Sequence, residues 1–221
     1  MRTLGCAMLL LAAAAVAPAQ QWEVGGLGGG SFLNTGSVSS PAGGATAGFQ
    51  TGAVGGAYFG QNLFPHLSGE VRYEFFQSNL QISSGSTSAS FSGLAHAIHY
   101  DLLFHTTRRH SPVQYFAAIG GGMKIFQGTG AETPYQATEQ WGYMTKTQEI
   151  KPMASLGGGI TYQLSPRVTL RVEFRDFLTP FPNKVIAPPS NSVKYPSLLN
   201  DLVPMFGLSY SFSSGGEKSD F

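Results

Sequence analysis

Charged side chains are scarce in this sequence: Asp, Glu, Lys and Arg make up 11% of its 221 residues, against roughly 25% in soluble domains. The formal net charge is +1, and no long run of one sign occurs. A basic footprint for nucleic acid is therefore absent. Disordered chains combine low hydrophobicity with high net charge, and a hydrophobic fraction of 42% excludes that class.

Cysteine is almost absent as well, because Cys6 is the only one. Without cysteine in the rest of the chain, a disulfide framework, a thiolate metal site and a thiolate nucleophile are excluded. No stretch after residue 19 approaches 18 consecutive apolar residues, so no transmembrane helix follows. We expect no metal and no cofactor.

The first residues have the organisation of a secretory signal peptide. Arg2 precedes an apolar run over 4–16, and Ala17, Pro18 and Ala19 fit the small-residue cleavage pattern. The alternative is a membrane anchor, but the apolar run is short for a span of about 20 residues. We therefore expect a signal peptide over 1–19 and a mature chain that begins at Gln20.

Beyond this leader, alternation of apolar and polar residues replaces helical periodicity, and glycine, which is costly inside helices, occurs throughout. The clearest case is 167–175, where Val168, Leu170, Val172 and Phe174 share one face of an extended strand. The same pattern predicts eight strands, over 22–32, 46–59, 67–75, 94–104, 113–126, 150–164, 167–175 and 203–212.

Seven of these strands have assignable faces, and in all seven every charged residue lies opposite the apolar set. The strand over 46–59 is rich in glycine and alanine, so its faces stay unassigned. His96 falls on the apolar side. The polar set comprises Glu70, Arg72, Glu74, His99, Asp101, Lys124, Lys151, Arg171, Glu173 and Arg175.

The lengths of the connections alternate too. The long ones are 33–45, 77–90, 127–148 and 179–200, and the short ones are 60–66, 105–112 and 165–166. Short turns on one side and long loops on the other are typical of an up-and-down membrane barrel. We therefore predict an all-β, eight-stranded antiparallel up-and-down transmembrane β-barrel over 20–212, followed by a short periplasmic tail over 213–221.

A soluble lipocalin-like barrel also has eight strands, with its apolar face inside. Three features favour the membrane version. The polar face consists mostly of small residues, aromatic residues lie near the strand ends, and the last strand ends in alternating large apolar residues. The last feature resembles the recognition signal for the barrel-assembly machinery, and its residues are Phe206, Leu208, Tyr210 and Phe212.

Two segments carry a family resemblance. The motif Y-F-G-Q-N-L followed by L-S-G-E-V-R-Y, within 58–73, and the motif G-G-G-I-T-Y-Q-L-S-P-R-V-T-L-R-V-E-F-R, over 157–175, resemble hairpins of small OmpA-like and OmpX-like outer-membrane barrels. The resemblance implies a lone barrel in the bacterial outer membrane. It also implies contact with outer-membrane lipids and lipopolysaccharide, and with the barrel-assembly machinery during biogenesis.

An eight-stranded barrel has an interior just wide enough to be filled by side chains. Charges in such a lumen must pair, because an isolated buried charge is costly. The ten polar-face residues therefore predict an ion-pair network that plugs the lumen. The alternative is a gated narrow conduit for ions or small solutes, in which exchange of partners opens a water path.

The histidines raise two further possibilities, a metal site and a catalytic site. His96 and His99 are three residues apart, so they lie on opposite faces of a strand and cannot share a metal. His66 and Ser68 superficially resemble the His-x-Ser of lipid A deacylases, but no orienting acid is evident. We expect no catalytic residues, and a lipid A-modifying enzyme is the least favoured function.

The sequence thus predicts an outer-membrane protein with both termini periplasmic and a structural or surface-interaction role. The four long loops, 33–45, 77–90, 127–148 and 179–200, would form the contact surface. No specific ligand follows from the residues, and a nucleic-acid partner is not expected.

Overall fold

The computed structural model describes residues 21–33, 36–41, 43–106, 111–129 and 138–213. The predicted signal peptide, with Ala17, Ala19 and Gln20, lies outside the described residues, as does the predicted tail after Ser213. Ser213 itself is the last residue of the last strand. The described residues contain no helix of the length and apolarity needed to cross a membrane.

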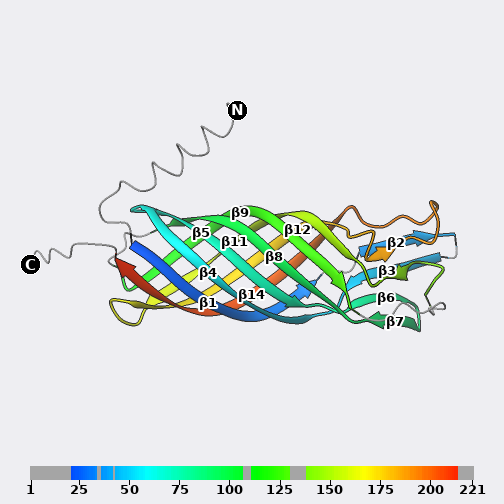
Figure 1. The fold of residues 1–221 in the computed structure, drawn as a ribbon, viewed down its shortest axis with the longest axis horizontal. Helices are drawn as coiled ribbons and strands as arrows, with labels where there is room; N and C mark the ends of the chain where they lie inside the picture. The colour runs from blue at the N-terminus through cyan, green and yellow to red at the C-terminus, as the bar shows by residue number, and fades with distance from the viewer. Residues whose placement is uncertain (1–20, 34–35, 42, 107–110, 130–137, 214–221) are drawn as a thin grey trace, which may run out of the picture.

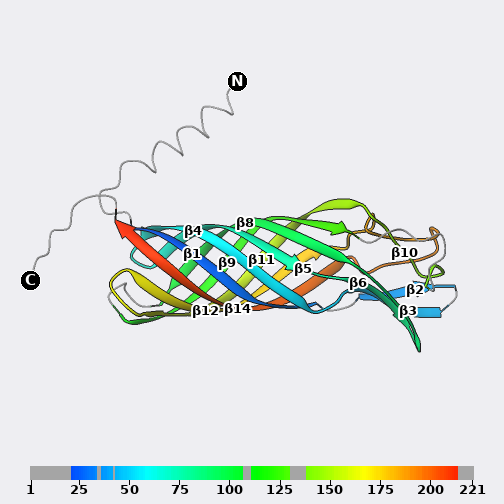
Figure 2. The ribbon, with the colours of Figure 1, turned by 60° about the horizontal axis from the view of Figure 1, so that its bottom comes forward.

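Eight antiparallel strands close into a barrel, as Figures 1 and 2 show from two sides. They are β1 (Gln21–Leu33), β4 (Gly52–Phe64), β5 (Leu67–Gln77), β8 (Gly93–His105), β9 (Val113–Gly128), β11 (Gln148–Gln163), β12 (Val168–Pro180) and β14 (Leu198–Ser213). Around the barrel their order is β1-β14-β12-β11-β9-β8-β5-β4, and β1 pairs with β4 to close it. The predicted fold class is confirmed.

The two faces of each strand meet different surroundings. Large apolar residues such as Phe174 and Phe206 are exposed on the outside, whereas Arg72 and Glu173 are buried inside. The residues that alternate along each strand therefore form an apolar exterior and a polar interior, the reverse of a soluble barrel.

The prediction of one strand over 46–59 was wrong. Residues up to Phe49 belong to β3 (Gly43–Phe49) outside the barrel, and the barrel strand β4 starts at Gly52. Phe49 stacks on Phe126 of β9 with ring centroids 5.1 Å apart, so this end of the segment packs against the head end of the barrel. A Cβ atom at Gly52 would collide with the carbonyl oxygen of Gln77, so glycine is required where β4 enters the barrel. The run of small residues gave no sign of this break.

The long connections are more ordered than the loops we predicted. Besides β3, they form β2 (Gly36–Ser40), β6 (Leu80–Ser84) and β7 (Thr87–Phe91), which make a four-stranded sheet in the order β2-β3-β6-β7. They also form β10 (Tyr143–Met144) and β13 (Ile186–Ala187), which pair with each other. We call these strands and their connections the head. It extends the molecule beyond one end of the barrel (Figure 1).

The apolar residues of the head form one hydrophobic core together with apolar residues that line the barrel lumen. Trp141 lies in this core, and its Nε1 donates to the carbonyl oxygen of Gly43 at 3.2 Å. The Tyr195 hydroxyl donates to the carbonyl oxygen of Trp141 at 2.8 Å, and burial raises the pKa of this phenol. These contacts fasten the connection after β9 and the connection after β12 to the four-stranded sheet.

Candidate functional site

Arg72, on β5, lies at the centre of the barrel and is fully buried. Its Nη1 donates to Glu70 Oε1 at 2.9 Å and its Nη2 to Glu74 Oε1 at 2.8 Å, both on the same strand. Across the lumen, Nη2 also donates to Glu173 of β12. One guanidinium thus joins carboxylates from two opposite strands, which fits its fan of five donors.

Two further arginines, both on β12, complete this cluster. Arg171 Nη1 donates to Glu70 Oε2 at 2.8 Å. Arg175 forms ion pairs with Asp101 at 2.8 Å and with Glu70 at 3.2 Å. We call the cluster the ion-pair layer; its members are Glu70, Arg72, Glu74, His99, Asp101, Arg171, Glu173 and Arg175.

His99 connects two carboxylates of this layer. Its Nδ1 lies 2.9 Å from Asp101 Oδ1 and its Nε2 lies 3.3 Å from Glu74 Oε2. A ring whose two nitrogens both face carboxylate oxygens donates from both only as an imidazolium. That form would balance the layer at four positive against four negative groups, since the arginines alone number three.

Glycines on the neighbouring strands make room for these large side chains. A Cβ atom at Gly157 would lie 2.7 Å from Arg175 Cδ, and one at Gly56 would lie 2.9 Å from Glu74 Cγ. Gly120 and Gly122 stand in the same relation to Asp101 and His99. Real Cβ atoms do not approach so closely, so the ion-pair layer fits only because these wall positions lack side chains.

A second layer lies between the ion-pair layer and the head. Lys124 Nζ donates to Asp201 Oδ2 at 2.7 Å, and the Ser31 hydroxyl donates to the other oxygen of Asp201. The lysine nitrogen lies 3.9 Å from the centre of the Phe76 ring, a cation–π contact. We call this set the aromatic layer; its residues are Ser31, Phe76, Lys124, Phe126, Phe177 and Asp201.

Lys151 differs from the other nine members of the predicted lumen set. It lies near the head end of β11, its side chain is partly exposed, and it pairs with Glu149 at 2.8 Å. The structure therefore brings eight predicted residues together in the ion-pair layer, places Lys124 in the aromatic layer and leaves Lys151 at the rim.

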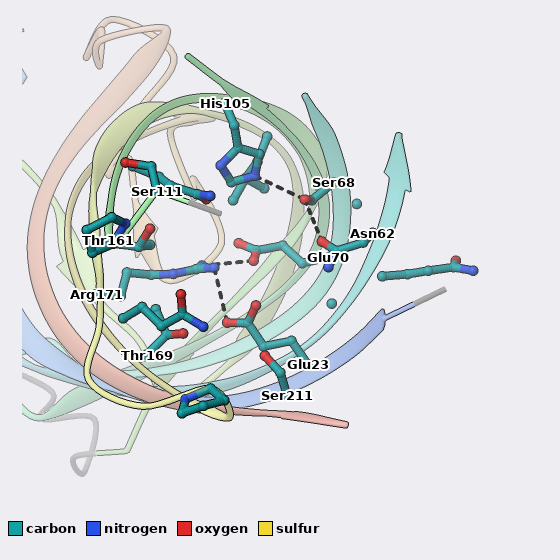
Figure 3. Close-up of a pocket in the computed structure, with 18 residues that line it drawn as sticks. Glu23, Asn62, Ser68, Glu70, His105, Ser111, Thr161, Thr169, Arg171 and Ser211 are labelled. Carbon is teal, nitrogen blue, oxygen red and sulfur yellow. Dashed lines mark hydrogen bonds and ion pairs between the residues drawn. The ribbon is translucent and has the colours of Figure 1, made fainter. Parts of the chain in front are cut away.

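The opposite end of the lumen is an open polar hollow, shown in Figure 3, which we call the vestibule. Arg171 and Glu70 form its inner end, and Glu23 lies beside them, 3.6 Å from Arg171. The Tyr58 hydroxyl donates to Glu23 at 2.7 Å. The other polar residues that line the vestibule are Gln61, Asn62, Ser68, His105, Ser111, Gln114, Thr161, Gln163, Thr169 and Ser211.

Ser68 lies in the vestibule, but its partner is not the histidine suggested by the sequence. Its hydroxyl lies 3.0 Å from His105 Nε2, whereas His66 Nδ1 lies 3.0 Å from the backbone oxygen of His105. Ser68 also donates to Asn62 Oδ1 at 2.9 Å. Ser68 Oγ therefore has two partners, the Asn62 amide oxygen and His105 Nε2, and the tautomer of His105 sets which atom donates in the second contact.

The residues proposed as the barrel-assembly signal, Phe206, Leu208, Tyr210 and Phe212, all lie exposed on the outer face of β14. Their outward direction agrees with the faces assigned from the sequence. Their role in assembly remains a prediction.

Four acidic residues of the barrel strands, Glu23, Glu149, Asp176 and Asp201, were missed by the sequence reasoning. Glu23 was noted only as the one charge of a weak strand, and Asp201 precedes the predicted last strand. Asp176 lies one residue beyond the predicted strand end. Longer strands than the alternation indicated would have found Glu149, Asp176 and Asp201, since β11, β12 and β14 all extend further toward the head.

Comparison with known proteins gives the family. The sequence matches the model of the outer membrane protein beta-barrel domain over residues 5–195. The chain belongs to this family. A search of curated proteins finds no match to the sequence.

Several solved structures are similar to this chain at low sequence identity. Neisserial surface protein A superposes with a TM-score of 0.54 at 12% identity, over 87% of this chain and 97% of that one. The N-terminal barrel of Pseudomonas aeruginosa OprF gives a TM-score of 0.46 at 10% identity, over 87% of this chain and 97% of that one. Ail, the attachment invasion locus protein of Yersinia pestis, gives a TM-score of 0.42 at 12% identity, over 89% of this chain and 100% of that one. At 12% identity the likeness to Neisserial surface protein A shows the fold alone, and the family model confirms the predicted membership of an outer-membrane barrel family.

Proposed function

We propose that this protein is a non-catalytic surface-interaction protein of the bacterial outer membrane, with the head outside the cell and the vestibule facing the periplasm. Long connections on the outside and short turns on the inside are the usual orientation of such barrels. The apolar exterior and the family membership support the membrane location.

The observation that carries this proposal is the contrast between the lumen and the head. The ion-pair layer and the aromatic layer fill the lumen in series, so the barrel offers no continuous path in this conformation. The head, by contrast, is a folded unit of paired strands that shares a core with the adjoining lumen and carries exposed polar residues. A sealed barrel that supports a folded head is suited to presenting a surface rather than to transport.

Replacing the two head hairpins by short glycine–serine turns tests the proposal. The replacements cover 36–49 and 80–91, the segments that form the four-stranded sheet. We expect the barrel to insert normally while adhesion of cells to host surfaces, or adsorption of phage, falls sharply. The control replaces Ser165 and Pro166, in a turn at the opposite end. Adhesion and phage adsorption that survive the head replacement would overturn the proposal.

The location is tested by membrane fractionation combined with heat-modifiability on a gel. We expect the protein in the outer-membrane fraction, with a folded form that migrates differently from the boiled form. An exclusively soluble product would refute the outer-membrane location. Contacts with lipids and lipopolysaccharide, and delivery by the barrel-assembly machinery through the exposed end of β14, are part of the same proposal.

A further inference from the structure

Asp176 is the exception to the rule that the charged residues of the barrel strands face the lumen. Across the eight barrel strands, all of them within the described residues, it is the only Asp, Glu, Lys or Arg on the lipid-facing side. It lies on β12 between Phe174 and Leu178, in line with exposed apolar residues. An ionisable residue on the lipid face of a membrane barrel is unfavourable unless it has a role or a partner.

Asn200 of β14 is the partner within the protein. Its Nδ2 donates to Asp176 Oδ2 at 3.0 Å, between strands that lie side by side in Figure 2. Two oxygens of this pair, Asp176 Oδ1 and Asn200 Oδ1, have no hydrogen-bond partner in the structure. Both are shielded from water by their surroundings, so solvent does not satisfy them as the side chains stand.

The pair lies near the level at which the barrel meets the head. Asn200 is the third residue of β14, and Asp176 pairs in register with Leu202, which in turn pairs with Phe32, one residue before the end of β1. Phe32 is an exposed aromatic residue, of the kind that marks a membrane interface. In the proposed orientation this is the headgroup level of the outer leaflet.

The ligand chemistry follows from the atoms. A carboxylate oxygen and an amide carbonyl oxygen are hard donors of the kind that Ca²⁺ and Mg²⁺ take, and such ions often complete their shells with phosphate oxygens and water. Within the described residues, no group of three or more His, Cys, Asp and Glu side chains could hold an ion unaided. At this level lipid phosphates are the external oxygens that would complete the shell of an ion held by the pair.

We infer that Asp176 and Asn200 form a half-site for a divalent cation that bridges the barrel to the phosphate of a lipid headgroup. Rotation of the two partly exposed side chains turns their unpartnered oxygens toward the ion. The inference goes beyond the proposed surface role, because it assigns a site on the lipid-facing wall and none in the head.

Paramagnetic Mn²⁺, used as a stand-in for Mg²⁺, tests this site by NMR. The full chain is placed in nanodiscs of phosphatidylglycerol, and broadening of backbone amide signals is followed as Mn²⁺ is added. We expect selective broadening at Asp176 and Asn200, with an apparent affinity at least tenfold lower in Asp176→Asn and about threefold lower in Asn200→Ala. Glu139→Gln, which removes a carboxylate from the head, should leave it unchanged.

Three outcomes would overturn the inference. The first is broadening that is absent or equal in wild type and Asp176→Asn. The second is equal Mn²⁺ affinity in phosphate-free maltoside micelles, or in such micelles with inorganic phosphate, because the lipid phosphate would then be unnecessary. The third is a response of the same amides to phosphatidylethanolamine without metal, which would assign the site to an ammonium group.

Discussion

Gly157 and Arg175 are register partners on β11 and β12, and the guanidinium stem of Arg175 occupies the space that a side chain at Gly157 would fill. The same relationship joins Gly56 to Glu74 and Gly120 to Asp101. Glycines and charges are therefore linked at this level of the lumen, because Gly56, Gly120 and Gly157 each accommodate a member of the ion-pair layer.

Gly157→Val is accordingly expected to prevent the barrel from closing around Arg175. The measurement is the fraction of heat-modifiable, folded protein after refolding into detergent. Gly28→Val is the matched control, since a Cβ atom there has its nearest neighbour at 4.0 Å on the lipid-facing side. Equal folding of the two variants would contradict the explanation offered for the lumen glycines.

Arg72→Leu is expected to destabilise the barrel strongly, because Glu70, Glu74 and Glu173 would lose their shared counter-charge. Breaking a buried ion pair in this way costs about 3–5 kcal/mol. Urea unfolding in lipid vesicles measures the loss. Lys151→Gln provides the comparison, since its partly exposed pair with Glu149 should contribute about 1 kcal/mol or less. A small effect of Arg72→Leu would mean that the layer contributes little to stability.

The two sealing layers in series predict that the lumen does not conduct. We expect no single-channel current in planar bilayers for the wild type, and none for Arg72→Ala, because the aromatic layer around Phe76 still closes the path. Phe76→Ala combined with Lys124→Ala should not conduct either while the ion-pair layer stays intact. Voltage-dependent current through the wild type would favour the gated-conduit alternative.

The Asn62 amide oxygen competes with His105 for the Ser68 proton, and we therefore expect the vestibule to be catalytically inert. A fluorophosphonate probe should leave Ser68 unlabelled, and lipid A should remain acylated with both the wild type and His66→Ala. Labelling that disappears in Ser68→Ala but persists in Ser111→Ala would establish a nucleophile in the vestibule and overturn the non-catalytic proposal.

Trp141→Phe is expected to loosen the head without unfolding the barrel. The substitution removes the hydrogen bond to the carbonyl oxygen of Gly43, an interaction of about 1 kcal/mol. Limited proteolysis should then cut the head faster while heat-modifiability stays unchanged. Tyr143→Phe, at a more exposed position of β10, should leave the proteolysis rate as it is.

The barrel strands could be predicted where two faces carry contrasting residues. Around Arg171 and Glu173 the alternation was strong enough to assign the inward face. Around Phe49 it failed, since glycine and alanine leave both faces alike and the switch from the head to the barrel depends on contacts with Phe126 and Gln77. Pairing partners also could not be predicted, because Arg72 and Glu173 are about a hundred residues apart in the chain.

The sequence by itself determined the number of barrel strands and the two contrasting faces of most of them, since these depend only on a period of two. Small residues on the polar face and aromatic residues near the strand ends then favoured the reversed polarity of the barrel. Tertiary structure decided the rest. Closure of the barrel brought eight distant polar residues into one ion-pair layer, folded the long connections into a head with a shared core, and left Asp176 beside Asn200 on the outer wall. Such contacts arise from the register between strands, which local alternation does not encode.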